Sequence, residues 1–245
     1  MLKVQNLKKY FGGIKAVDNV NFDVKKNSIT ALIGPNGSGK TTLFNLISGI
    51  IEKDSGKIIL DNKNITDYSV SKISNTGISR IFQKSRLFPN LSVKENLLIA
   101  IDNEDMKFWK NILNRNKVTK EKETKVKKML KLVEMSDFEN KKASELSYGQ
   151  KRLIELIRAI LNPHKILLLD EPVAGVTPRL RKEISKLLIK MKSEGDTILL
   201  IEHDMNFALN LADNVIVMDE GKIISQGKPE KIKNNRKVLE AYLGE

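Results

Sequence analysis

The residues best placed to do chemistry form a run at positions 34–41, Gly-Pro-Asn-Gly-Ser-Gly-Lys-Thr. This run fits G-x-x-x-x-G-K-[ST] at every fixed position. Glycines let successive backbone N–H groups turn inward around an anion, and a helix that begins there adds its positive end. In such loops the lysine, here Lys40, reaches the β- and γ-phosphates of a nucleotide, and the hydroxyl of Thr41 ligates Mg²⁺.

The flanking sequence supports this interpretation. An apolar stretch, Ile29 to Ile33, directly precedes the run and predicts a buried strand, and residues 42–47, from Thr42 onward, predict the start of a helix. The alternative is a glycine-rich turn with an incidental lysine. We favour a phosphate loop (residues 34–41), because a strand before the motif and a helix after it are the context that distinguishes a phosphate-binding loop from a chance match.

Two adjacent carboxylates follow a second apolar strand. Residues 166–169 are Ile-Leu-Leu-Leu, and Asp170 and Glu171 come directly after them. At such a strand end Asp170 can hold Mg²⁺, and Glu171 can deprotonate an attacking water. The alternative is an ordinary strand exit stopped by Pro172. The phosphate loop upstream makes the functional interpretation the better one.

A third motif, Leu-Ser-Tyr-Gly-Gln at 146–150, leads into a predicted helix that runs to Leu161. Its serine hydroxyl, glycine N–H and helix N-terminus predict a second anion site. Because the chain already has a phosphate loop, we infer that this site serves a nucleotide held by a second subunit. The alternative is a helix start capped by Ser147.

Together these motifs resemble those of the ATP-binding cassette (ABC) family, whose signature is usually L-S-G-G-Q. Tyr148 stands where the usual signature has glycine. The resemblance covers nearly the whole chain and implies an ATPase that uses ATP and Mg²⁺. It implies a P-loop NTPase core of the α/β class with a mostly parallel sheet, an N-terminal antiparallel β-subdomain and an inserted helical subdomain.

The resemblance also assigns roles to residues outside the three motifs. It implies that Phe11 stacks on adenine, with Tyr10 as the adjacent alternative and a plain core aromatic as another, and that Val17 lines the base pocket. Gln83 would contact Mg²⁺ or water and sense the transport partner, and His203 would hold the γ-phosphate and water. Residues 174–178 would cross to the other subunit.

The complete set of expected site residues is as follows. Catalytic roles fall to Lys40, Glu171 and His203; metal binding falls to Thr41, Gln83 and Asp170; nucleotide binding falls to Phe11, Val17, Gly34, Pro35, Asn36, Gly37, Ser38, Gly39, Lys40, Thr41, Thr42, Gln83, Ser147, Gly149 and Gln150. The other histidine, His164, is expected to be solvated and without a role.

The chain of 245 residues is expected to be one ABC domain. We assign 1–90 and 147–228 to the core with its β-subdomain, 91–146 to the helical subdomain and 229–245 to a helical tail. Alternating residues around 3–7 and 20–24 predict the antiparallel strands, whereas apolar runs at 166–169, 197–201 and 215–218 predict buried parallel ones.

Three phrases, at 146–150, 170–178 and 201–205, resemble the ATPase subunits of branched-chain amino acid importers. Lipopolysaccharide-export ATPases are similar and remain the alternative. The resemblance implies a second ATPase subunit, identical or paralogous, together with membrane permease subunits and an extracytoplasmic substrate-binding protein. Leu87, Phe88 and Pro89 would form the permease groove, or else simple core.

Composition limits the remaining possibilities. The chain has no cysteine, no N-terminal apolar segment and no apolar run near the roughly 20 residues that span a bilayer. We therefore expect a cytoplasmic protein, peripheral on the inner face of the membrane. The net charge of +13 is spread along the chain, which favours solvated surface and attraction to anionic headgroups over a dedicated nucleic-acid patch. A soluble ABC ATPase acting on nucleic acid or ribosomes is the less favoured alternative.

Overall fold

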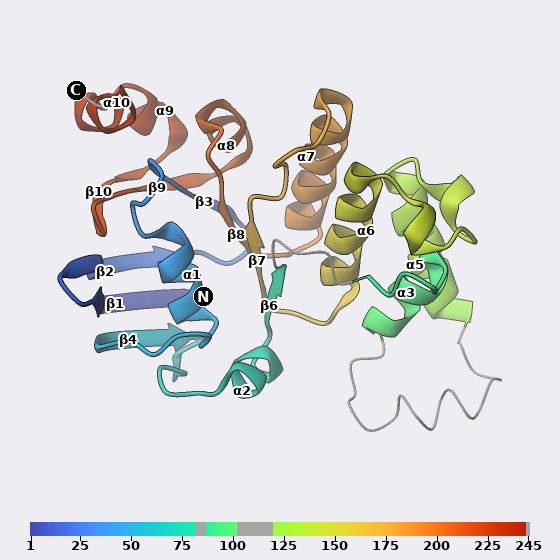
Figure 1. Cartoon of the computed structure of the whole chain (residues 1–245), viewed down its shortest axis with the longest axis horizontal. Helices are drawn as coiled ribbons and strands as arrows, with labels where there is room; N and C mark the ends of the chain where they lie inside the picture. Colours follow the sequence, from blue (N-terminus) through green and yellow to red (C-terminus); the bar gives the residue numbers. More distant parts are fainter. Residues whose placement is uncertain (82–86, 102–119, 244–245) are drawn as a thin grey trace. The chain divides into compact units, whose positions relative to one another are not determined.

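The computed structural model describes residues 1–81, 87–101 and 120–243. Contacts within the chain divide it into two units (Figure 1). The first contains Met1–Arg80, Lys165–Glu171 and Met191–Glu245, and the second contains Ile81–His164 and Pro172–Lys190.

The first unit carries a six-stranded sheet with the order β10-β9-β3-β8-β7-β6. The pairs β9–β3, β3–β8 and β8–β7 are parallel, whereas β10 pairs antiparallel with β9. The strands are β3 (Ile29–Ile33), β6 (Ile78–Ile81), β7 (Ile166–Asp170), β8 (Ile198–Ile201), β9 (Asn214–Asp219) and β10 (Lys222–Gly227). Every residue of β3, β7 and β8 is buried, as the continuous apolar runs predicted.

A four-stranded antiparallel sheet, with the order β2-β1-β4-β5, belongs to the same unit. Its strands are β1 (Leu2–Phe11), β2 (Ile14–Val24), β4 (Ser55–Leu60) and β5 (Lys63–Asn64). The predicted mostly parallel core and N-terminal antiparallel sheet are therefore confirmed.

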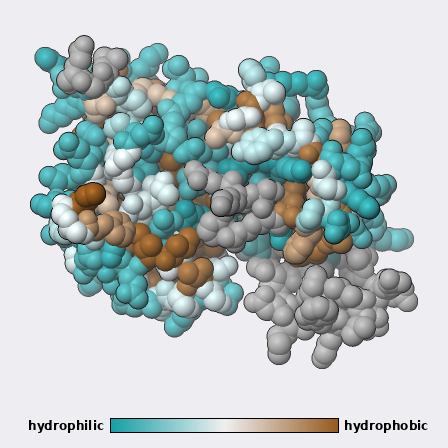
Figure 2. Space-filling view, in the orientation of Figure 1, coloured by the Kyte–Doolittle hydropathy of each residue, from teal (hydrophilic) through white to brown (hydrophobic). Residues whose placement is uncertain are grey.

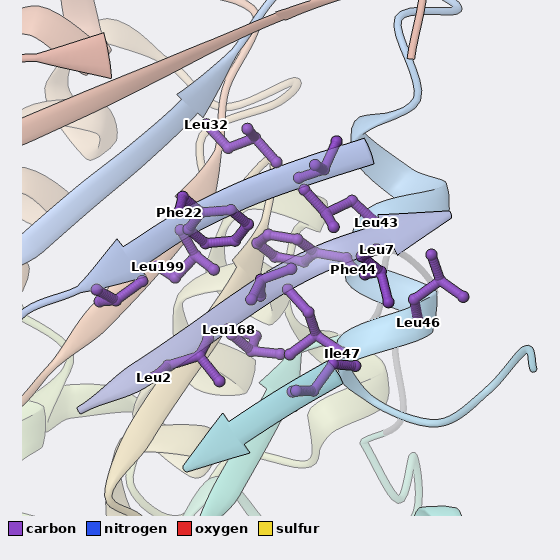
Figure 3. Close-up of a cluster of buried hydrophobic side chains, with 14 of the residues drawn as sticks. Leu2, Leu7, Phe22, Leu32, Leu43, Phe44, Leu46, Ile47, Leu168 and Leu199 are labelled. Atoms are coloured by element: carbon purple, nitrogen blue, oxygen red, sulfur yellow. The ribbon is translucent and has the colours of Figure 1, made fainter. Parts of the chain in front are cut away.

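Helix α1 (Lys40–Ile47) fills the core of this unit. Figure 3 shows the ring of Phe44 among side chains from β1, β2 and the central sheet, including Leu7, Phe22 and Leu168. All of these side chains are at most 5% exposed. Because α1 starts at the end of the phosphate loop, its packing fixes the position of that loop.

The shorter helices of the first unit are α2 (Val70–Asn75), α8 (Met205–Leu211), α9 (Pro229–Lys233) and α10 (Arg236–Leu243). Helices α9 and α10 lie in the segment 229–245 that was predicted as a helical tail. Helix α10 contacts β10, and Val238 buries its side chain completely.

The second unit is helical. It contains α3 (Val93–Ile101), α5 (Lys120–Leu132), the short helices η1 (Ser136–Phe138) and η2 (Ala143–Glu145), α6 (Tyr148–Leu161) and most of α7 (Pro178–Ser193). Helix α3 contacts both α5 and α6. The predicted helical subdomain at 91–146 therefore lies inside a larger unit, because α6 shares the apolar interface of α3.

The surface is mostly polar. Figure 2 shows a largely hydrophilic face with apolar residues in small areas. Helix α5 agrees with this, because five of its six lysines are exposed: Lys120, Lys125, Lys127, Lys128 and Lys131. In the part of the chain that the structure describes, no helix is long and apolar enough to cross a membrane.

Candidate active site

The phosphate loop connects β3 to α1 and packs tightly against two other strands. Gly39 has φ +99°, and a Cβ there would lie 2.1 Å from the carbonyl oxygen of Ala16 in β2. Gly34 has φ +151°, and its Cβ would lie 2.0 Å from the carbonyl oxygen of Met218 in β9. Both positions therefore require glycine, for backbone conformation and for space.

Lys40 turns its ammonium group back toward this loop. Its Nζ donates to the carbonyl oxygens of Gly34 at 2.9 Å and Pro35 at 2.7 Å, and lies 3.2 Å from Ser38 Oγ. Lys40 is only 4% exposed. Burial lowers the pKa of Lys40, while the nearby carboxylates of Glu171 and Asp170 raise it. The loop thus holds a cation among its backbone groups, which suits the binding of an anion.

A cleft of about 720 Å³ opens beside the loop, a size typical of small-molecule sites. It brings together eight of the predicted residues with others from β2 and the β9–β10 turn. The predicted members are Asn36, Gly37, Gly39, Lys40, Thr41, Thr42, Glu171 and His203, and the others are Gly13, Ile14, Lys15, Ala16, Asp18, Glu220, Gly221 and Lys222.

Glu171 and His203 meet in this cleft. Glu171 follows β7 and has φ +50°, a left-handed conformation that is rare outside glycine. Its N–H donates to the carbonyl oxygen of Ile201 at 3.1 Å, which holds the turn in place. Its Oε1 lies 2.6 Å from Nε2 of His203. A carboxylate paired with an imidazole is suited to positioning and deprotonating a water molecule.

Asp170 ends β7 and is 2% exposed. Its Oδ2 accepts a hydrogen bond from Nη2 of Arg80 at 3.1 Å. The Thr41 hydroxyl and the Asp170 carboxylate offer the hard oxygen ligands that Mg²⁺ prefers. No group of three His, Cys, Asp or Glu residues within 1–81, 87–101 and 120–243 could hold a metal alone. This donor set fits an ion whose other ligands come from water and phosphates. Gln83 lies outside the described residues.

Tyr10 and Phe11, the aromatic residues at the β1–β2 turn, differ in their hydrogen bonds and exposure. The Tyr10 hydroxyl donates to Asp18 Oδ1 at 2.7 Å, and the Tyr10 N–H donates to Asp54 Oδ2 at 2.6 Å. The bond to Tyr10 is the main cause that lowers the pKa of Asp18. Phe11 is 48% exposed and pairs across the turn with Ile14, which lines the cleft. This arrangement favours Phe11 over Tyr10 as the residue available to stack on a base.

Val17 does not line the cleft, so the expectation for this residue needs correction. Its side chain is fully buried in the core, while its neighbours Ala16 and Asp18 face the cleft. The cause is an irregularity in β2: Asn19 has φ +56°, and Val17 and Val20 both point inward. Simple alternation along the strand would have placed them on opposite faces.

The signature turn (residues 147–150) lies in the second unit. Ser147 is the N-cap of α6: the N–H of Gln150 donates to Ser147 Oγ at 3.3 Å, and the N–H of Ser147 donates to Gln150 Oε1 at 2.9 Å. This reciprocal capping box confirms the predicted helix start. A pocket of about 530 Å³ in this unit is lined by the whole signature turn and also by Gly175, Val176 and Thr177.

The segment predicted to meet a permease is partly described. Leu87 is half-buried, and Phe88 and Pro89 are exposed. The buried side chain of Asn96 holds this segment, because its Oδ1 accepts from the N–H of Phe88 at 2.8 Å and its Nδ2 donates to the Phe88 carbonyl at 3.1 Å. The exposure of Phe88 and Pro89 favours a surface role over simple core.

Sequence reasoning missed Asp18, Lys222 and Arg80. Asp18 and Lys222 reach the cleft from β2 and β10, with Nζ of Lys222 3.8 Å from Asp18 Oδ2. No motif marks them, since their position depends on strand pairing. Arg80 did carry a signal, as the one charged residue of the four-residue strand Ile-Ser-Arg-Ile. His164 was expected to be solvated, yet it is partly buried, with Nδ1 2.7 Å from the Asn162 carbonyl oxygen.

Comparison with known proteins agrees with this site. Residues 17–174 match the ABC transporter family model, and residues 222–245 match a model described as branched-chain amino acid ATP-binding cassette transporter. A probable branched-chain amino acid transport ATP-binding protein LivG of Archaeoglobus fulgidus is 40% identical over 247 residues, covering 100% of this chain and 95% of the relative. The LivG protein of Escherichia coli is 36% identical over 251 residues, covering 100% and 98%.

Solved structures give the same result. The ADP conformation of an ATP-binding cassette of an ABC transporter superposes with a TM-score of 0.84 at 37% identity, covering 100% of this chain and 99% of that one. The family model covers most of the chain, and these relatives cover all of it. The chain therefore belongs to the ABC transporter family, as an ATP-binding and ATP-hydrolysing subunit.

Proposed function

We propose that this chain powers an importer of branched-chain amino acids. Its curated relatives carry that function in their names, and its last 24 residues match the model described for such transporters. In this role two ATPase subunits, identical or paralogous, act on membrane permease subunits, and a substrate-binding protein delivers the amino acid. The chain would then lie on the inner face of the membrane.

The chemistry rests on one observation, the contact of 2.6 Å between Glu171 and His203 in the cleft beside Lys40. We assign Glu171 as the general base that takes a proton from the attacking water. His203 orients Glu171 through the same contact, and we assign it the further role of holding the γ-phosphate and the water. Lys40 stabilises the charge that develops on the phosphoryl group during its transfer.

Mg²⁺ would be held by Thr41 and Asp170, with Gln83 as a further ligand. When bound, it neutralises charge on the β- and γ-phosphate oxygens. Phe11 stacks on the base, and the N–H groups of the phosphate loop surround the phosphates.

The signature turn serves the nucleotide of the second subunit. The capping box leaves Ser147 Oγ as an acceptor from Gln150, so its own hydroxyl hydrogen can be donated to a phosphate oxygen. Such a pairing is two-fold symmetric or nearly so. ATP stabilises the closed pair, and hydrolysis allows the pair to open. Because the closed and open pairs differ in nucleotide affinity, this cycle can drive a conformational change in the permease.

The test is Glu171→Gln, which keeps the size of the side chain and removes the base. ATP affinity should stay within about twofold, turnover should fall by about 100-fold or more, and ATP-dependent dimers should persist. Normal hydrolysis by this variant would show that Glu171 is not the base.

The transported substrate needs a separate experiment. In a strain that lacks this chain, uptake of labelled leucine, isoleucine and valine should fall, and the chain itself but not Glu171→Gln should restore it. Unchanged uptake of all three amino acids would exclude them as the cargo.

A further inference from the structure

Arg80 is a buried cation that joins three elements of the first unit. It stands in β6, its side chain is 6% exposed, and its Nη2 donates to Oδ2 of Asp170 at the end of β7. Its Nη1 lies 2.8 Å from Asn45 Oδ1 and 2.7 Å from Ser48 Oγ. One guanidinium group therefore holds the carboxylate with one nitrogen and the last turn of α1 with the other.

The far end of this bridge is itself well anchored. Ser48 Oγ lies 2.7 Å from the carbonyl oxygen of Phe44, which it reaches as a donor, so it accepts from Arg80. The ring of Phe44 lies 5.6 Å from Arg80 Cζ, within cation–π range. A planar group with five donors can satisfy these partners together, whereas the compact ammonium of a lysine cannot.

The two ends of the bridge carry different parts of the candidate metal site. Helix α1 begins with Lys40 and Thr41 and ends beside Asn45 and Ser48, so a constraint on its last turn also constrains its first. Asp170 belongs to another element, and a metal held by Thr41 and Asp170 requires a fixed distance between them. Partners of metal ligands usually provide such constraints.

We propose that Arg80 is a positioning residue that holds the Asp170 carboxylate in register with helix α1, and so with Thr41. The inference rests on the proposed function, in which Asp170 and Thr41 bind Mg²⁺.

The alternative is that Arg80 only compensates a buried charge. A purely structural role predicts lower thermal stability and a loss of all nucleotide binding in proportion to unfolding. A positioning role predicts a selective change in the response to Mg²⁺. The two can be separated with ADP, because its binding to the isolated chain needs no second subunit.

The experiment measures the affinity for ADP with and without Mg²⁺, and the Mg²⁺ concentration at half-maximal effect. Variants are Arg80→Lys, Arg80→Gln and Ser48→Ala, each also followed by thermal unfolding. We expect ADP affinity without Mg²⁺ within about twofold of the natural chain, and a half-maximal Mg²⁺ concentration raised about tenfold or more in Arg80→Gln. Arg80→Lys and Ser48→Ala should show smaller increases.

Two controls make the result specific. Arg152→Lys changes another buried arginine with a carboxylate partner, Glu155, and should leave the Mg²⁺ response unchanged. Asp170→Asn should abolish most of the Mg²⁺ effect, and Arg80→Gln added to it should raise the half-maximal concentration no further, since the two residues act through one interaction.

The outcomes are distinct. If Asp170→Asn loses the Mg²⁺ effect while Arg80→Lys, Arg80→Gln and Ser48→Ala keep it, the positioning role is overturned and the metal assignment stands. If Asp170→Asn responds to Mg²⁺ normally, the metal assignment fails and the positioning role fails with it. If Arg80→Gln does not fold, Arg80→Lys and Ser48→Ala decide, and a normal Mg²⁺ response in both overturns the proposal.

Discussion

The phosphate loop at 34–41 and the signature turn at 147–150 are both glycine-containing turns that lead into a helix. The phosphate loop packs against its own chain. Lys40 is buried, and carbonyl groups of β2 and β9 lie so close to Gly39 and Gly34 that neither position has room for a Cβ. The signature turn is open, since Tyr148 is 63% exposed and the side chain of Ser147 accepts a hydrogen bond from Gln150 of its own helix. Gly149 lacks the positive φ of Gly34 and Gly39.

This difference shows how the two turns can serve one reaction. The phosphate loop already holds a cation among its backbone groups and is ready to bind nucleotide within its own unit. The helix start at the signature turn is already satisfied by the capping box, and we propose that this turn completes the site of another molecule. The predictions below test this contrast between an internal site and a half site.

Lys40→Ala should have the largest effect. Removing the ammonium group should lower nucleotide affinity by about 100-fold, because a buried charged hydrogen-bond donor is lost. Turnover should become undetectable. Binding of a fluorescent ADP analogue to the isolated chain measures the change, with Ser147→Ala as the matched variant that should bind ADP normally. Equal losses in both variants would contradict the contrast.

Gly39→Ala should reduce stability by about 3 kcal/mol or more, since the new Cβ would lie 2.1 Å from a carbonyl oxygen at φ +99°. Gly149→Ala should cost less than about 1 kcal/mol, because its Cβ meets only the flexible end of Leu180. Gly195→Ala, with φ +109° and open space, isolates the backbone strain. Urea unfolding measures all three, and equal costs at Gly39 and Gly149 would refute the packing argument.

Ser147→Ala should reduce stability by about 1 kcal/mol through loss of the N-cap, and turnover by at least about tenfold through loss of the phosphate donor. Ser69→Ala is the control, since Ser69 caps α2 by accepting from the N–H of Lys72. It should cause a similar change in unfolding free energy with no change in ATPase rate. If both variants keep full turnover, the signature serine does not contact the phosphate.

Tyr242→Phe should have the smallest effect at neutral pH. The buried hydroxyl meets hydrogen-bond geometry with none of the described residues, so its removal should be neutral or stabilising by up to about 1 kcal/mol. Burial raises the pKa of Tyr242 to about 12.

The sign of the pH effect follows from that shift. Below pH 10 the tyrosine is protonated in both the folded and unfolded chain. Between pH 10 and about 12 only the unfolded chain loses the proton, so the free energy of unfolding falls as pH rises, by at most about 3 kcal/mol from this group. Tyr242→Phe should remove that part of the decline. Parallel curves for the natural chain and Tyr242→Phe would contradict this.

Sequence reasoning identified the parts of the site that depend on local order. Buried strands followed by glycines or carboxylates place Lys40, Asp170 and Glu171 at one edge of a parallel sheet, and apolar runs predicted those strands. The capping box at Ser147 is equally local, because cap and partner are three residues apart.

The rest depends on contacts between distant segments. The prediction that Val17 lines the base pocket was wrong because the irregularity at Asn19 interrupts the alternation of inward and outward side chains in β2. No pattern in the sequence predicts this irregularity. Arg80 could not be linked to Asp170, since 90 residues separate them and only the pairing of strands in the sheet brings them together.

The most direct test of the central claim mixes two variants with impaired turnover, Lys40→Ala and Ser147→Ala. If each active site combines the phosphate loop of one chain with the signature turn of another, a mixed pair contains one intact site. Equal mixing should then recover up to about a quarter of the natural ATPase rate. If both turns served the same chain's nucleotide, no intact site would form, and a mixture no more active than its separate components would contradict the account.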